Sequence, residues 1–188
     1  LIDPLKLVEL EGCNPRIQMG NVRWYKDPTP ENIYLVTLDP SSGTGGDNAA
    51  IQVIETPSMI QVAEWYHNKS PIEKQIKTMM EIMHYIKDQT KSLSEIYWTV
   101  ENNTIGEAAL VVIRDTGEES FPGYFLHEPK RIQGKKGRKG YHTTHKNKME
   151  ACIQLKRLIE SDKLKLQSKA LISELKSFVS SGNSFKAK

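Results

Sequence analysis

The sequence contains few cysteines and no long apolar segment. Its 188 residues include only Cys13 and Cys152, too few for a disulfide framework or a cysteine-rich zinc site, so a reducing, intracellular setting is expected. No apolar run approaches the ~20 residues that a membrane-spanning helix requires. The first ten residues carry Asp3, Lys6 and Glu9, a pattern unlike a secretory signal peptide. We therefore expect one globular domain with an ordinary hydrophobic core.

Acidic residues are missing from one stretch of the chain. Residues 130–148 hold eight Lys/Arg and no Asp/Glu, whereas residues 1–129 hold 10 Lys/Arg and 19 Asp/Glu. Glycines are interleaved with these basic residues and would let the chain follow a DNA backbone closely. Because Lys and Arg bind phosphates independently of base sequence, we interpret this basic segment as DNA-binding, with an unliganded, solvated loop as the alternative. The candidate DNA-binding residues are Lys130, Arg131, Lys135, Lys136, Arg138, Lys139, Lys146 and Lys148.

The sequence also lacks a nucleotide-binding P-loop. The Gly-rich stretch GTGGDN, residues 43–48, has no Gly-Lys-Ser/Thr ending to surround a phosphate chain. A sugar-kinase or actin-like ATPase would also place an Asp before a small-residue turn. Such an enzyme needs a second phosphate loop and a larger, two-lobed chain, and neither is found. An ATP site is therefore not predicted in these residues.

Hydrophobic periodicity predicts an α/β fold with a mixed sheet flanked by helices. Three consecutive strands come first, and helices then alternate with strands, an order that places helices on the sheet faces. Residues 1–30 are expected to be a lead-in segment or linker, apart from a short strand at 22–25, and residues 31–188 form the domain. The predicted strands are 33–38, 49–54, 60–66, 96–100 and 124–127, with a brief extended piece at 164–166. The predicted helices are 72–86, 104–115, 146–161 and 170–179.

Two carboxylates follow predicted strands at positions suited to metal chemistry. Asp39 ends the first strand and Glu101 ends the fourth, and no basic residue lies within four positions of either. If these strands are neighbours, both side chains emerge at the same edge of the sheet. Carboxylate oxygens are the ligands that Mg²⁺ and Mn²⁺ prefer, and such ions can activate water for phosphodiester hydrolysis. The pattern alone equally allows Asp39 to cap a turn and Glu101 to begin a loop.

The segments around these acids resemble one protein family. YLVTLDPSSGTGGDNAAIQVIE, residues 34–55, is similar to the first catalytic motif of large terminase subunits of tailed double-stranded DNA phages, especially of the T-even type. IYWTVENNTIG, residues 96–106, is similar to their second motif. GYHTTHKNKMEACIQLKRLIESDKLKL and LISELKSFVSSGNSF resemble their C-terminal part, so the likeness spans residues 33–186. The resemblance implies a ribonuclease H-like fold.

The resemblance also implies a function and partners. The chain is expected to be the nuclease domain of a DNA-packaging motor that cuts concatemeric double-stranded DNA in the host cytoplasm with Mg²⁺ or Mn²⁺. The metal would be held by Asp39 and Glu101, and both acids would be catalytic. The terminase ATPase domain, the portal protein and the small terminase subunit are the implied partners. The family's third acid follows a segment like residues 184–187, beyond Lys188, so we expect the metal site within these residues to be incomplete.

Several alternatives stay open at the level of sequence. Asp47 either contributes to the metal site or pins the turn at residues 43–46. His142 and His145 are candidate bases or ligands, although histidines with this spacing are more often surface residues. A resolvase or integrase of the same fold would share Asp39 and Glu101. A non-catalytic DNA-binding module would need only the basic segment. The tryptophans, Trp24, Trp65 and Trp98, are expected to pack in the core rather than against bases.

Overall fold

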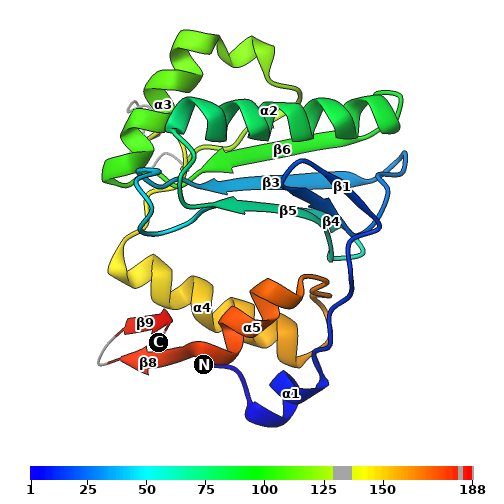
Figure 1. The fold of residues 1–188 in the computed structure, drawn as a ribbon, viewed down its shortest axis with the longest axis vertical. Coiled ribbons are helices and arrows are strands. Elements are labelled where there is room, and N and C mark those ends of the chain that lie inside the picture. The colour runs from blue at the N-terminus through cyan, green and yellow to red at the C-terminus, as the bar shows by residue number, and fades with distance from the viewer. Residues whose placement is uncertain (129–136, 182–183, 188) are drawn as a thin grey trace.

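The computed structural model describes residues 1–128, 137–181 and 184–187. Seven strands form one mixed sheet in the order β1-β2-β5-β4-β3-β6-β7, with helices above and below it (Figure 1). The predicted mixed sheet flanked by helices is thus confirmed. The strands are β1 (Ile17–Met19), β2 (Val22–Trp24), β3 (Ile33–Asp39), β4 (Ala49–Thr56), β5 (Ile60–His67), β6 (Glu95–Val100) and β7 (Tyr124–Phe125).

The main core lies between the sheet and two helices, α2 (Ile72–Gln89) and α3 (Thr104–Thr116). Figure 1 shows both helices on the same side of the sheet, followed along the chain by the short 3-10 helix η1 (Glu118–Ser120). Along β3, Tyr34, Val36 and Leu38 are buried in this core and the alternate residues face away. Since side chains alternate between the faces of a strand, Asp39 lies on the face opposite the main core.

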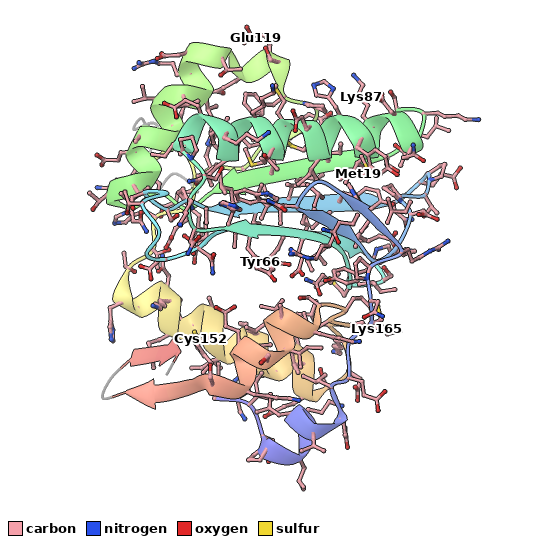
Figure 2. All side chains as sticks on the ribbon, viewed as in Figure 1. Met19, Tyr66, Lys87, Glu119, Cys152 and Lys165 are labelled. Carbon is pink, nitrogen blue, oxygen red and sulfur yellow. The ribbon has the colours of Figure 1, made fainter. Side chains whose placement is uncertain are left out.

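A second layer lies beyond that opposite face (Figure 1). It contains α1 (Pro4–Glu9), α4 (His145–Glu160), α5 (Lys169–Ser177) and a hairpin of β8 (Phe178–Ser181) and β9 (Ser184–Ala187). Ile159, Leu164 and Leu175 form a smaller core there, against Ile54 of β4. Figure 2 shows Cys152 in this layer and Tyr66 on the side of β5 that faces it. The second layer therefore attaches to the β4–β5 part of the sheet, whereas on this face the side chains of β3 and β6 are exposed or half-buried.

Residues 1–30 are folded as part of the domain. They supply α1, β1 and β2, and Trp24 is buried in the main core. Ile2 packs in the second core. In the structure, the chain therefore has no packing boundary at residue 31.

The remaining predictions about elements are confirmed with shifts at their ends. The last helix stops at Ser177, where the chain turns into β8, rather than at residue 179. The extended piece at 164–166 appears as a parallel bridge between Lys165 and Ile60. The tryptophans are buried, as expected, and both cysteines are free thiols. None of the helices within the described residues is long and apolar enough to cross a membrane.

Candidate active site

Asp39 and Glu101 meet at one edge of the sheet. Strands β3 and β6 are parallel neighbours in which Leu38 pairs with Val100, and the Glu101 backbone N donates to the Leu38 carbonyl oxygen at 2.9 Å. The condition on which the sequence argument depended, that these two strands are neighbours, is therefore met. Both acids line an open pocket of about 430 Å³, which we call the acid pocket. Its other lining residues are Pro40, Ser41, Ser42, Asp47, Asn48, Asn103, Ile105 and Lys148.

The electrostatics of the acid pocket favour a cation. Burial, the hydrogen bond and charge of the facing Glu101 carboxylate, and the charge of Asp47 raise the pKa of Asp39 to about 7, while Lys148 acts in the opposite direction. Asp39 nevertheless keeps solvent-exposed surface, so water tempers the effect of burial, and the proximity of Glu101 is the more specific cause. Two carboxylates this close repel each other when both are ionised. A bound divalent cation would relieve that repulsion.

The loop after Asp39 is held by a buried glutamine. Gln75 of α2 is fully buried, and its Nε2 donates to the carbonyl oxygens of Ser41 and Ser70, each at 2.8 Å. Its Oε1 accepts from the Ser41 backbone N at 3.3 Å. Gly43 has a φ of +69°, and a Cβ there would lie 2.1 Å from the Ser70 carbonyl oxygen. The loop therefore leaves Asp39 along one path that is fixed by α2.

Glu101 is oriented by a residue that the sequence analysis did not select. Asn103 Nδ2 donates to Glu101 Oε2 at 2.9 Å, while Asn103 Oδ1 accepts from the Gly106 backbone N at 3.3 Å. Asn103 is thus the N-cap of α3 and also holds the carboxylate. The cap preference of Asn before a predicted helix could have identified its first role, but nothing in the sequence indicates the second.

We predict that Asn103→Asp lowers the rate of DNA cleavage by at least about tenfold and leaves the melting temperature nearly unchanged. Aspartate caps helices about as well as asparagine, but it replaces the amide donor to Glu101 with a fourth carboxylate in the acid pocket. Asn103→Ala should lower the melting temperature as well, because loss of a cap costs about 1 kcal/mol. Cleavage kinetics and thermal melts of both variants test this. Parental cleavage by Asn103→Asp would contradict the role of Asn103 in holding Glu101.

Asp47 lies in the acid pocket and makes no hydrogen bond within the described part of the chain. The turn before it is held instead by Asn68, whose carbonyl oxygen accepts from Gly45 N at 2.8 Å and whose Nδ2 donates to the Gly45 carbonyl oxygen at 3.2 Å. Asp47 also lines a cavity of about 540 Å³ between the sheet and α5, together with Asp39 and Glu174. Its carboxylate is therefore free to approach a cation bound by Asp39.

The described basic residues lie in different parts of the structure. Lys148 of α4 lines the acid pocket, whereas Arg138 and Lys139 line a neighbouring pocket. Lys146 is highly exposed on α4 and faces Glu150 at 4.0 Å. The other four predicted DNA-binding residues, Lys130, Arg131, Lys135 and Lys136, lie outside the described residues. No pattern in the sequence indicates that Lys148 belongs with the two acids.

The two histidines do not line the acid pocket. His142 Nδ1 is hydrogen-bonded to the Asn102 carbonyl oxygen at 2.8 Å, and His145 is the exposed first residue of α4. Among the described residues, no group of three or more His, Cys, Asp or Glu side chains is arranged to enclose a metal ion. The donor set, two facing carboxylates with Asp47 nearby, nevertheless fits Mg²⁺ or Mn²⁺, which keep several water or phosphate ligands.

Comparison with known proteins agrees with this geometry. The family described as the terminase RNaseH-like domain matches residues 36–188. The chain belongs to this family. No match is found among curated proteins. The terminase family and the ribonuclease H-like fold inferred from the sequence are thereby confirmed, while the particular likeness to T-even phages stays a prediction.

Three solved structures of terminase nucleases have a fold similar to that of this chain. The magnesium-bound large terminase nuclease of the thermophilic phage G20c has a TM-score of 0.69 at 15% identity, covering 97% of this chain and 86% of that one. The large terminase nuclease domain of Thermus phage P74-26 has a TM-score of 0.65 at 15% identity, with coverages of 97% and 83%. The manganese-soaked terminase nuclease domain of human cytomegalovirus has a TM-score of 0.61 at 16% identity, with coverages of 94% and 86%.

Proposed function

We propose that this chain is the metal-dependent endonuclease domain of a phage DNA-packaging terminase. It would cut concatemeric double-stranded DNA when packaging begins and again when the head is full. The observation that carries the proposal is the meeting of Asp39 and Glu101 on adjacent parallel strands, in an open pocket of a terminase RNaseH-like domain. The similar structures named above are terminase nucleases, one with bound magnesium and one soaked with manganese.

Asp39 and Glu101 are the proposed catalytic metal ligands, and Asp47 is a third candidate for the same site. A bound Mg²⁺ or Mn²⁺ would supply an activated water and stabilise negative charge on the leaving oxygen. Asn103 keeps Glu101 pointed into the pocket, and Lys148 offers a positive charge to the phosphate that enters it. Since Asp39 must lose its proton to act as a ligand, metal affinity should rise as the pH passes through about 7.

The basic residues are proposed to bind the DNA backbone around this pocket. Contacts from Lys and Arg to phosphates would give an affinity with little sequence preference and a strong dependence on salt. Membership in the terminase family supports an ATPase domain, a portal protein and a small terminase subunit as partners. It also supports action in the cytoplasm of the host cell, where the packaging motor would work.

Nicking and linearisation of supercoiled plasmid test the proposed activity. We expect the full-length protein to cleave with Mn²⁺ or Mg²⁺ and not after the metal is removed with a chelator, because the metal ion would activate the attacking water and stabilise the leaving oxygen. Restoring the metal should restore cleavage. Binding of linear duplex without cleavage in any divalent metal would favour a non-catalytic DNA-binding module. Strong preference for a four-way junction over linear duplex would favour a resolvase-type nuclease.

A further inference from the structure

A second cavity adjoins the acid pocket at the start of α3. It has a volume of about 540 Å³, and we call it the basic pocket. Asn103 lines both cavities, so they meet at the residue that orients Glu101. The lining residues of the basic pocket are Asn102, Asn103, Thr104, Glu107, Arg138, Lys139 and His142.

The wall of the basic pocket is fixed to the strand that carries Glu101. Tyr141 N donates to the Val100 carbonyl oxygen at 2.9 Å, and Asn102 N donates to the Tyr141 carbonyl oxygen at 2.7 Å. Asn102 Nδ2 also donates to the Lys139 carbonyl oxygen at 2.9 Å. Gly140 has a φ of +71°, and a Cβ there would lie 2.6 Å from the Val100 carbonyl oxygen. The backbone that presents Arg138 and Lys139 is therefore held at a set distance from Glu101.

The charges in the basic pocket suit one oxyanion. The Arg138 guanidinium makes no ion pair within the described residues, whereas the Lys139 ammonium pairs with Glu118 of η1. Amide and hydroxyl groups of Asn103 and Thr104 supply neutral hydrogen-bonding partners, and Glu107 is the acid among the lining residues. Guanidinium groups bind phosphate through two parallel hydrogen bonds. Among the described residues no Phe, Tyr or Trp lines the cavity, and the one aromatic ring there, His142, is hydrogen-bonded to the Asn102 carbonyl oxygen, so a stacked base is a poor fit.

We propose that the basic pocket binds a single backbone phosphate of the DNA, at a fixed number of nucleotides from the bond positioned in the acid pocket. Arg138 contacts this phosphate, and the neighbouring polar groups complete its environment. The contact sets where the duplex lies relative to Asp39 and Glu101, so it governs the position of the cut without reading base sequence. This inference rests on the proposed nuclease function.

Cut-site mapping on duplexes that carry one neutral methylphosphonate linkage tests the proposal. For the parent protein, we expect the cleavage rate to decrease at the modified bond itself. We expect a second decrease at one other bond, at a constant offset from the modified bond wherever the linkage is placed. In Arg138→Ala, the reduction at the offset bond should disappear, because the contact that senses the charge is gone. Arg114→Ala is the matched control, since this exposed arginine near the end of α3 lines neither pocket, and it should keep the offset.

The dependence of DNA affinity on salt gives a second measurement that needs no cleavage. Arg138→Ala should flatten the log–log salt slope by about one unit. If both cations serve the same phosphate, Arg138→Ala/Lys139→Ala should flatten it by about one unit in total, whereas two independent phosphates would give about two.

The outcomes separate the phosphate site from the proposed nuclease function. No offset bond in the parent, or an offset that persists in Arg138→Ala, overturns the proposal, as does a loss of about two units in the double variant. If the parent cuts no duplex in any metal, the nuclease function fails. The salt slopes then decide the phosphate site on their own: about one unit in both variants supports it, and an unchanged slope in Arg138→Ala overturns it. Circular dichroism of each variant checks that the fold is retained.

Discussion

Asp39→Asn and Glu101→Gln are each expected to lower the rate of DNA cleavage by about a thousandfold or more. Removal of one charged metal ligand should cost about 4 kcal/mol of transition-state stabilisation, and each 1.36 kcal/mol corresponds to tenfold in rate. Both substitutions preserve shape, so DNA affinity without metal should stay close to that of the parent. The rates are measured under single-turnover conditions with Mn²⁺.

The melting temperature of these two variants is not expected to decrease along with their cleavage rate. Glu101 and Asp39 face each other closely enough to raise the pKa of Asp39, so removing one charge relieves repulsion in the metal-free protein at pH 8. The melting temperature is expected to hold or rise. Asp115→Asn, at an exposed position near the end of α3, is the matched control and should change neither property. Cleavage within tenfold of the parent in either site variant would show that the acids are not essential ligands.

Gly106→Ala is expected to destabilise the domain and abolish most of its cleavage. A Cβ at this position would lie 1.9 Å from the Glu101 carbonyl oxygen, so α3 or the end of β6 must shift. Helix propensity alone predicts the reverse, since alanine stabilises a helix interior by about 1 kcal/mol relative to glycine. We expect the steric effect to win, with a net loss of about 2 kcal/mol, in the range measured for overpacked sites.

Gly46→Ala provides the matched comparison for Gly106→Ala. Gly46 lies in the turn before Asp47, and a Cβ there would meet no atom within 4 Å. Its melting temperature should therefore equal that of the parent. Chemical denaturation gives the free energy of unfolding for both variants. If Gly106→Ala proves as stable as the parent, the close approach of α3 to Glu101 is wrong.

The long elements could be predicted from the sequence because they bury regular apolar faces. The strands around Val36 and Trp98 and the helix around Met79 all contribute to one core, and their spacing alone indicates strand or helix. The order of the elements also allowed β3 and β6 to be neighbours, but did not require it. Helix α2 continues to Gln89, three residues past the predicted end. The predicted helix was too short because the last turn is polar and carries no periodic hydrophobic signal.

Strand β1 and helix α1 could not be predicted from the sequence because they depend on distant contacts. Strand β1 has three exposed residues and exists because β2 pairs with it, while β2 in turn pairs with β5. Helix α1 has six residues and no buried side chain, too short to be stable alone.

The candidate site also contains some residues that could be predicted from the sequence and others that could not. Asp39 and Glu101 were found because each ends a strand, a local feature. Asn103 and Lys148 were not recognised as part of the site, because their relation to the acids arises only when α3 and α4 are in place. Sequence patterns thus identify the groups at strand ends but not the side chains that reach them from other elements.

The alternation of side chains along β3 has a consequence for how this site can change during evolution. Gain or loss of one residue between Ile33 and Leu38 would exchange the two faces of the strand. Asp39 would then point into the apolar core, where an unpaired carboxylate is costly to bury. Length changes in the turn at residues 41–46 would leave the alternation of β3 intact. Lineages are therefore expected to differ in the length of this turn while the length of β3 stays constant.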